Sequence, residues 1–192
     1  MRVANLDSIN INGISARTRV EMLTDLIRRH DLTILFVQEV TSQDTLEING
    51  YITYLNFGTA MRGTAVLARN GFHLTSIATI PSGRAIAADF SGIPLIDVYA
   101  PSGTARGTER EDSYNSELPE LFYPASLPII IGGDINCTLH HTDATGHFST
   151  SRALSEIVRG FALMDTWYFD PHSLTTPSLG PQGLIGFTCL QN

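Results

Sequence analysis

The chain has 192 residues, of which 43% are apolar, and these values are typical of one globular domain with a substantial core. Its net charge of −7 argues against a protein that grips nucleic acid by bulk electrostatics, because such domains are usually basic. An enzyme that holds a phosphodiester through a metal ion remains compatible, since the metal supplies local positive charge.

Targeting segments are not evident in the sequence. No apolar stretch approaches the ~20 residues that cross a bilayer, and the first ten residues lack the long apolar region of a secretory signal. We therefore expect an intracellular protein that does not span a membrane. In such a protein the two cysteines, Cys137 and Cys189, are expected to be free thiols rather than a disulfide.

Strand patterns dominate the chain. The segment "SINING" begins with alternating apolar and polar residues, and "TILFVQE" and "PIIIGGD" are apolar runs typical of buried strands. Between these lie five further strand patterns separated by turn residues, namely "YITYLNF", "GTAVLAR", "FHLTSIATI", "RAIAADF" and "PLIDVYAP". From Thr166 onward the sequence is rich in Pro, Gly, Ser and Thr, and we assign no elements there.

Three helices are predicted from apolar side chains at helical spacing. The first runs from about Thr18 to His30, the second from Glu109 to Phe122 with Pro119 as the point where it would break, and the third from about Ser151 to Phe161. Many strands with few helices between them predict an α/β protein whose sheets are partly antiparallel. The continuous apolar runs predict strands covered on both faces, so two packed sheets with helices outside satisfy the pattern.

Polar side chains recur where the predicted strands end. They are two carboxylates, three carboxamides and one phenol: Asn10, Asn12, Glu39, Tyr99, Asp134 and Asn136. If these strand ends converge, their oxygen atoms suit magnesium, which prefers one or two carboxylates together with waters and substrate phosphate oxygens. Each feature also has a simpler interpretation. "NING" and "GGD" are common turn sequences, Glu39 could be a solvated strand end, and Tyr99 could be a core aromatic residue.

The ordered set "NING", "QE", "YAP" and "GDIN" resembles the endonuclease/exonuclease/phosphatase superfamily. Within it the sequence is most similar to the apurinic-type endonuclease domain of LINE-type (non-LTR) retrotransposons, from "SININGIS" to "GFT". The resemblance implies a four-layer α/β sandwich, with two packed mixed sheets flanked by helices. It also implies hydrolysis of a DNA phosphodiester with Mg²⁺ or Mn²⁺, nuclear action if the substrate is genomic DNA, and a reverse-transcriptase domain as a partner in a parent polyprotein.

The resemblance also implies a role for individual residues. Asn10 and Asn12 match an asparagine pair near metal and phosphate, and Glu39 matches the main metal ligand. Tyr99 matches a tyrosine that hydrogen-bonds the scissile phosphate. The remaining matches are Asp134, which orients or activates the attacking water, Asn136, which steadies the phosphate, Asp165, which is structural, and Thr188, near the DNA-binding face.

Two closing motifs of the family pattern do not occur in the sequence. After the "FT" strand the pattern continues with Arg/Lys-Ile-Asp and then Ser-Asp-His, whereas residues 1–192 end in "GFTCLQN". We therefore expect a single domain whose last strands are missing and whose activity is slow or absent, because general acid–base assistance is worth ~10²–10⁴-fold. His140 and His141 lie nearest to "GDIN" among the histidines, but we expect a surface or structural role for them.

Two alternatives to a nuclease remain open at this stage. One is an inactive remnant that binds nucleic acid weakly. The other is a phosphatase or a sphingomyelinase-like phosphoesterase that acts on a small molecule or a lipid. The context of "NING" and "YAP" favours the nuclease over the second alternative.

Overall fold

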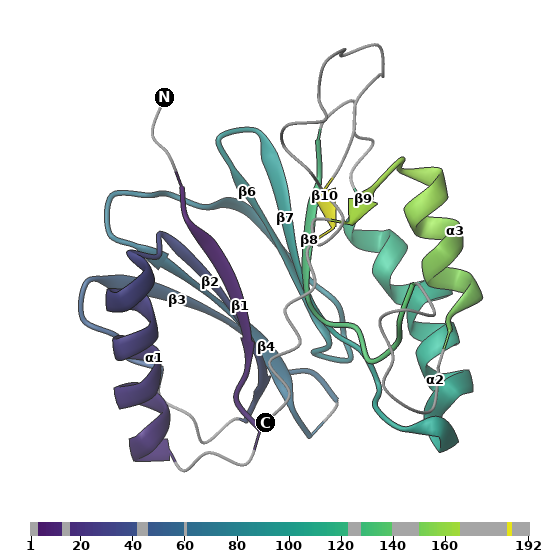
Figure 1. Cartoon of the computed structure of the whole chain (residues 1–192), viewed down its shortest axis with the longest axis horizontal. Coiled ribbons are helices and arrows are strands. Elements are labelled where there is room, and N and C mark those ends of the chain that lie inside the picture. The colour runs from purple at the N-terminus through teal and green to yellow at the C-terminus, as the bar shows by residue number, and fades with distance from the viewer. Residues whose placement is uncertain are drawn as a thin grey trace.

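The computed structural model describes residues 4–12, 16–41, 46–59, 61–122, 128–139, 150–165 and 184–185. Within these residues the strands form two mixed sheets (Figure 1). The first sheet has the order β1 (Leu6–Asn10), β2 (Ile34–Val40), β4 (Gly63–Arg69), β3 (Tyr51–Asn56). The second has the order β5 (Thr75–Thr79), β6 (Ala85–Phe90), β7 (Ile93–Tyr99), β8 (Ile130–Asp134), β10 (Leu184–Ile185), β9 (Met164–Asp165).

Helices cover the outer face of each sheet. Helix α1 (Ala16–His30) packs on the first sheet through Leu23 and Ile27. Helix α3 (Arg152–Gly160) and a helical path from residue 104 to 121 pack on the second sheet. Figure 1 shows α1 on one side of the molecule and α2 (Gly107–Asp112) and α3 on the other, with both sheets between them. Two sheets flanked by helices are the predicted four-layer α/β sandwich, which is thereby confirmed.

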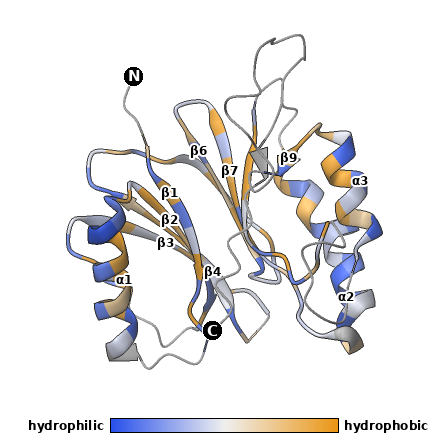
Figure 2. Cartoon of the chain, in the orientation of Figure 1, coloured by the Kyte–Doolittle hydropathy of each residue, from blue (hydrophilic) through white to orange (hydrophobic). Residues whose placement is uncertain are grey.

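The two sheets meet through an apolar core to which, among the described residues, no helix contributes a side chain. Its buried members come from both sheets and from Leu74, which directly precedes β5: Ile34, Phe36, Val66, Ala68, Leu74, Ile86, Ala88 and Leu95. Strand β2 is buried along its whole length because α1 covers one face and the second sheet covers the other. This explains the continuous apolar run in the sequence, and Figure 2 shows the hydrophobic colouring concentrated on the strands and on the inner sides of the helices.

Local sequence explains where the helices begin and end. Ser151 caps α3, because its hydroxyl accepts a hydrogen bond from the backbone N–H of Leu154 at 3.0 Å. The predicted second helix is less regular than expected. It begins as η1 (Thr104–Arg106) and α2 (Gly107–Asp112), then becomes a π-helical turn, η2 (Ser113–Glu117), and a 3₁₀ turn, η3 (Leu118–Leu121). Pro119 lies at the start of η3, where its missing N–H is tolerated.

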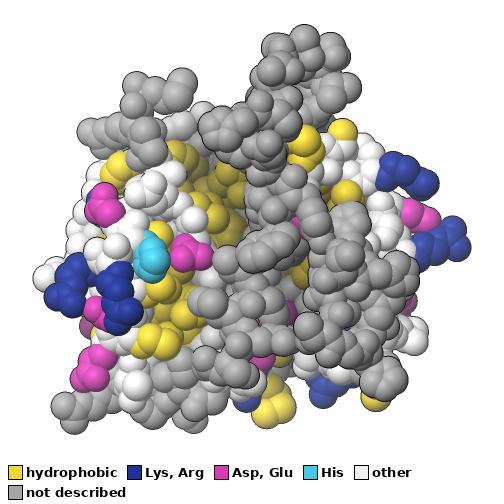
Figure 3. Space-filling view, in the orientation of Figure 1, with side chains coloured by type: hydrophobic (Ala, Val, Ile, Leu, Met, Phe, Trp, Pro, Cys, Tyr) yellow, Lys and Arg dark blue, Asp and Glu magenta, His cyan; other side chains and the backbone are white. Residues whose placement is uncertain are grey.

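Charged side chains on the face seen in Figure 3 gather over the outer helices, at the left over α1 and at the right over α3, with hydrophobic surface between them.

Within the described residues, no helix is both long and apolar enough to cross a membrane.

Candidate active site

Parallel pairing brings four of the predicted strand ends to two adjacent places. In the first sheet β1 and β2 are parallel, with Asn10 opposite Gln38. In the second sheet β7 and β8 are parallel, with Tyr99 opposite Asp134. Strands β1 and β8 also lie in contact between the sheets. The carboxyl ends of these four strands therefore meet at one end of the sandwich.

Asn10 joins the two sheets at this end. Its side-chain Nδ2 donates one hydrogen bond to Glu39 Oε1 at 3.0 Å and another to Asp134 Oδ2 at 2.7 Å. Its Oδ1 accepts from the backbone N–H of Asn12 at 2.8 Å, and this fixes which end of the carboxamide faces the two carboxylates. We call Asn10, Glu39 and Asp134 the strand-end cluster. The predicted convergence of these three residues is present in the structure.

Glu39 reaches the cluster through an irregularity in strand β2. The pairing with β4 shifts between Gln38 and Val40, which makes Glu39 the extra residue of a β-bulge, and its φ is +63°. Bulges re-aim a side chain, and a positive φ in a residue other than glycine is uncommon. The Glu39 side chain is only 7% exposed, so the bulge presents a nearly buried carboxylate to the site.

Asp134 is oriented from both sides of its strand end. The backbone N–H of Asn136 donates to Asp134 Oδ1 at 3.2 Å, and the Asp134 carbonyl accepts from the Ala100 N–H at 2.8 Å. Asn136 has a φ of +49° and donates from Nδ2 to the Ala100 carbonyl at 2.9 Å. Between them Ile135 is buried in the core of the second sheet. Ile135 thus anchors the turn in the core, while Asp134 accepts from Asn10 and the Asn136 side chain binds the Ala100 carbonyl.

Tyr99 lies beside Asp134 on the neighbouring strand, as predicted, and its side chain is buried. The guanidinium of Arg84 stacks over the Tyr99 ring, 5.4 Å from the ring centroid. Arg84 also donates to Glu109 Oε1 at 2.9 Å. The stacking and the ion pair together restrict the orientation of the Tyr99 ring.

The sequence did not single out Arg62, yet this residue contacts the site directly. Its guanidinium forms an ion pair with Glu39 Oε2 and donates a hydrogen bond to Asn12 Oδ1. Arg62 follows the β3–β4 turn and precedes Gly63, which pairs with Val40 just beyond the bulge. The positively charged guanidinium of Arg62 therefore lies between Glu39 and Asn12, the two residues proposed from the sequence as metal ligands.

Other predicted residues lie outside the cluster or outside the described residues. Asp165 is in β9, in register with Ile185 of β10 and, through it, with Ile131 of β8. It is thus two strands away from β8, at the height of a residue that precedes Asp134 by three positions. Its structural role stays a prediction. Thr188 lies outside the described residues, as do His140 and His141.

The donor set fits a hard divalent cation. Glu39 and Asn12 offer oxygen atoms close enough to share one guanidinium, and Asp134 is linked to Glu39 through Asn10. The described residues contain no group of three or more His, Cys, Asp and Glu side chains placed to hold a metal. A site with so few protein ligands suits Mg²⁺, which keeps several waters and uses substrate oxygens as ligands.

Cysteine chemistry does not fit this site. Burial raises the pKa of the Cys137 thiol to about 11, so the thiolate needed for nucleophilic attack is scarce at neutral pH. Cys137 is a free thiol, and its neighbour is the buried Tyr114 hydroxyl at 3.9 Å.

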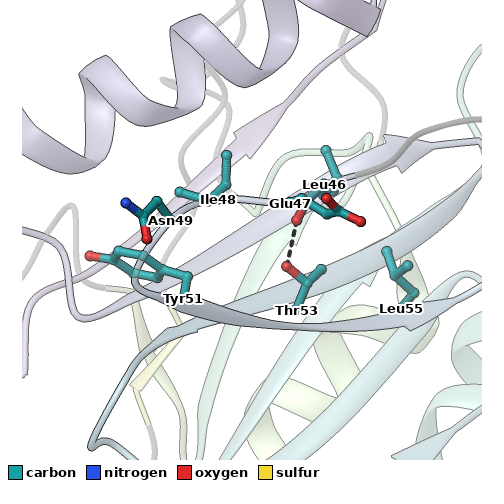
Figure 4. Close-up of a pocket in the computed structure, with 7 residues that line it drawn as sticks. All are labelled: Leu46, Glu47, Ile48, Asn49, Tyr51, Thr53 and Leu55. Atoms are coloured by element: carbon teal, nitrogen blue, oxygen red, sulfur yellow. Dashed lines mark hydrogen bonds between the residues drawn. The ribbon is translucent and has the colours of Figure 1, made fainter.

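An open pocket of about 550 Å³ lies elsewhere, between segment 46–49 and strand β3 (Figure 4). Its lining is Leu46, Glu47, Ile48, Asn49, Tyr51, Thr53 and Leu55. Thr53 Oγ1 donates to the Leu46 carbonyl at 2.7 Å and ties the two walls together. None of the cluster residues lines this pocket, and it offers a single carboxylate, so it is not a second candidate for the same chemistry.

Comparisons with known proteins bear on the family and on the fold. A model of the Endonuclease/Exonuclease/phosphatase family matches residues 8–183. An exodeoxyribonuclease of Bacillus subtilis (strain 168) is 30% identical over 155 residues, which are 72% of this chain and 60% of that protein, so the chain spans about three-fifths of its relative.

Solved structures share the fold. An AP endonuclease from Archaeoglobus fulgidus matches with a TM-score of 0.67 at 18% identity, covering 82% of this chain and 70% of its own. The 3′ phosphatase NExo from Neisseria, bound to a product DNA hairpin, matches with a TM-score of 0.60 at 17% identity, covering 74% and 61%. D. rerio TDP2, complexed with a single-strand DNA product, matches with a TM-score of 0.58 at 16% identity, covering 70% and 61%. From the family match over most of its length, the chain belongs to the Endonuclease/Exonuclease/phosphatase family.

Proposed function

We propose that this protein hydrolyses a phosphodiester bond of DNA with the help of a divalent metal ion. The observation that carries the proposal is the strand-end cluster, in which Asn10 hydrogen-bonds both Glu39 and Asp134 where the two sheets meet. Rigid strand ends hold reacting groups more accurately than loops do, and accurate placement is a large part of catalysis.

Each residue has a distinct role in this proposal. Asp134, held by Asn10 and by the Asn136 N–H, accepts a proton from the attacking water and orients it. Tyr99 and Asn136 donate hydrogen bonds to the non-bridging phosphate oxygens. Glu39 and Asn12 would hold Mg²⁺ or Mn²⁺, which when bound stabilises the negative charge that develops on the phosphate.

DNA as the substrate is supported by the relatives. The B. subtilis relative is an exodeoxyribonuclease, and the NExo and TDP2 structures contain DNA products. The finer assignment to a retrotransposon-type nicking endonuclease, with a reverse-transcriptase partner and nuclear action, rests on the motifs "NING", "YAP" and "GDIN".

A plasmid assay tests the activity. We expect the protein to nick supercoiled DNA slowly with Mg²⁺ and to stop when the metal is removed by a chelator. Asp134→Ala should lower the rate at least ~100-fold, because it removes the group that activates water. Asp112→Ala, at an exposed carboxylate on α2, is the matched control and should not change the rate.

Two outcomes would favour the alternatives. A protein that binds DNA but cleaves none with Mg²⁺ or Mn²⁺ would favour a non-catalytic nucleic-acid-binding module. Release of inorganic phosphate or phosphocholine in preference to DNA nicking would favour a phosphatase or a sphingomyelinase-like enzyme.

Metal binding has its own test. We expect weak Mg²⁺ binding that Glu39→Ala removes, because much of the coordination must come from water and substrate. Glu47→Ala, at an exposed carboxylate outside the cluster, should bind Mg²⁺ as the wild type does. Titration calorimetry measures both, and equal binding by the wild type and Glu39→Ala would remove Glu39 from the metal site.

A further inference from the structure

A chain of buried polar side chains crosses between the two sheets directly beneath the strand-end cluster. Gln38 Nε2 donates to Ser8 Oγ at 3.0 Å and to Asp97 Oδ1 at 2.6 Å. Ser8 is on β1, Gln38 on β2 and Asp97 on β7, so these bonds connect the first sheet with the second. Gln38 and Asp97 are 0% exposed and Ser8 is 3% exposed. We call these three residues the inter-sheet network.

On each of its three strands, the network residue comes just before a residue of the site in the chain. Side chains two residues apart on a strand point to the same face. On β1 the step leads from Ser8 to Asn10, and on β7 it leads from Asp97 to Tyr99. On β2 the bulge places Glu39 immediately after Gln38.

The apolar core continues below the network on the same face. On β2 the inter-sheet positions before Gln38 are Ile34 and Phe36, and on β7 the position before Asp97 is Leu95. Toward the strand ends, the inner face of the sandwich therefore carries first the apolar core, then the buried inter-sheet network, and then the strand-end cluster.

The fourth strand of the site also rests on Asp97. A Cβ atom added to Gly133 would lie 2.9 Å from Asp97 Oδ1 and 2.1 Å from the Val98 carbonyl oxygen. Gly133 immediately precedes Asp134, and its lack of a side chain lets the backbone of β8 approach the Asp97 carboxyl. Asp97 thus contacts the strands that carry Glu39 and Asp134.

The carboxyl of Asp97 is suited to this place in its neutral form. Desolvation by complete burial raises its pKa well above the usual range, and the nearby Asp134 carboxylate adds to the rise. Hydrogen bonds from Gln38 and from the Val37 and Val98 backbone oppose the shift without cancelling it. A protonated acid avoids the large cost of a buried charge, yet it still specifies one hydrogen-bonding geometry.

We propose that Asp97 is a positioning residue, which through Gln38 and Ser8 fixes the placement of Asn10 and Glu39 on one sheet relative to Tyr99 and Asp134 on the other. An apolar contact would stabilise the docked sheets as well, but it would select their relative position less strictly, because dispersion and the hydrophobic effect are not directional. Hydrogen bonds of defined geometry set the register, and the two hydrogen bonds of Asn10 across the sheets require that register.

The test separates positioning from stability. In Ser8→Ala/Gln38→Met/Asp97→Val the network is replaced by apolar groups, and such replacements of buried polar groups are often neutral or stabilising. We expect its melting temperature to stay within a few degrees of wild type. We expect the Asn10 side-chain amide, followed by ¹⁵N NMR, to lose its hydrogen-bonded shift and to exchange its protons at least tenfold faster.

Two further variants complete the comparison. Asp97→Asn, which is neutral and can still accept from Gln38, should keep the wild-type Asn10 signal. Thr64→Val removes a buried hydrogen bond on the adjacent strand, from Thr64 to the Gly83 carbonyl, and should also keep it. If the triple variant does not fold, Gln38→Met alone removes the central donor and gives the same comparison.

A folded network variant with an unchanged Asn10 signal would overturn the proposal, and so would loss of the signal in Thr64→Val. A second measurement rests on the proposed function. The affinity for Mn²⁺ should fall at least tenfold in the triple variant and stay unchanged in Asp97→Asn. Absence of Mn²⁺ binding by the wild type would contradict the proposed metal site alone, because the NMR comparison needs no metal.

Discussion

Glu39 has the least common backbone conformation among the residues of the strand-end cluster. Its positive φ costs on the order of 1–3 kcal/mol for a residue other than glycine, and such conformations persist only where the surroundings enforce them. Here the surroundings are the paired strands β1 and β4 on either side of β2 and the hydrogen bond from Asn10. The strain is the consequence of turning a carboxylate out of a fully buried strand.

Arg62 would compete with the proposed metal ion for that carboxylate. Because its guanidinium contacts both Glu39 and Asn12, a divalent ion must displace it before binding to them. We expect Arg62→Met to raise the affinity for Mg²⁺ about fivefold, which corresponds to roughly 1 kcal/mol for a partly exposed ion pair. Titration calorimetry measures the change.

The matched control is Arg69→Met, at the opposite end of the same strand. Arg69 pairs with Asp31 and not with the cluster, so its loss should leave the Mg²⁺ affinity unchanged. An affinity for Mg²⁺ that falls in Arg62→Met would show instead that Arg62 supports the site.

Sequence alone predicts part of this site. Asn10, Glu39 and Asp134 could be found because each follows an apolar strand in an ordered motif. Arg62 could not, because its position depends on the β2 bulge and on the β3–β4 turn, and neither leaves a clear pattern in the sequence. Asp97 could not be predicted for a different reason. It lies inside an apolar strand, and the sequence around it does not indicate which residue of the other sheet it will hydrogen-bond.

Among the elements, β8 shows how closely the site strands approach. Gly133 has a φ of +122°, and an added Cβ would lie 2.1 Å from the Val98 carbonyl oxygen. Gly133→Ala therefore forces β8 away from β7, and we expect the free energy of unfolding to fall by roughly 3 kcal/mol, as for other severe steric substitutions. Urea denaturation measures the change.

Gly92 provides the matched control for β8. It also has a positive φ, of +85°, but it lies in the β6–β7 turn with no atom within 4 Å of an added Cβ. Gly92→Ala should cost only about 1 kcal/mol, from backbone strain alone. Similar losses for the two variants would mean that close packing at Gly133 is not what β8 requires.

The elements themselves were predicted unevenly. Helices α1 and α3 were predicted nearly to their ends, because each has an apolar stripe and α3 has a serine cap. The middle helix was predicted as one α-helix with a break, whereas the structure divides it into α, π and 3₁₀ turns. A single π or 3₁₀ turn is too short to show its own apolar period in the sequence. Strand β10 was not predicted, because two residues are too few to show a period.

At the scale of the whole molecule, the site exists only because two sheets dock in one arrangement. The apolar spacing of β2 and β7 predicts that both strands are buried, but it does not say which of their side chains will meet. In the folded protein, the hydrogen bond from Gln38 to Asp97 in the inter-sheet network specifies which side chains of the two strands face each other. The same network links the stability of the whole fold to pH.

Asp97 is expected to make the free energy of unfolding fall as pH rises. In the unfolded chain an aspartate loses its proton near pH 4, whereas in the folded protein burial keeps the pKa of Asp97 well above that value. The unfolded state therefore binds fewer protons than the folded state above pH 4. This one group lowers the free energy of unfolding by at most about 1.4 kcal/mol per pH unit until the folded Asp97 itself ionises.

Asp97→Asn removes this titration and leaves the other groups in place. The variant and the wild type should have similar free energies of unfolding near pH 4, and the variant should become progressively more stable than the wild type toward pH 8. Urea denaturation of both proteins at pH 4, 6 and 8 measures the difference. The nearby Asp134 carboxylate is common to both proteins, so its own titration largely cancels from the difference. A difference that stays constant over this range would mean that Asp97 is already ionised in the folded protein, with its charge stabilised by the Gln38 amide and the backbone of β2 and β7.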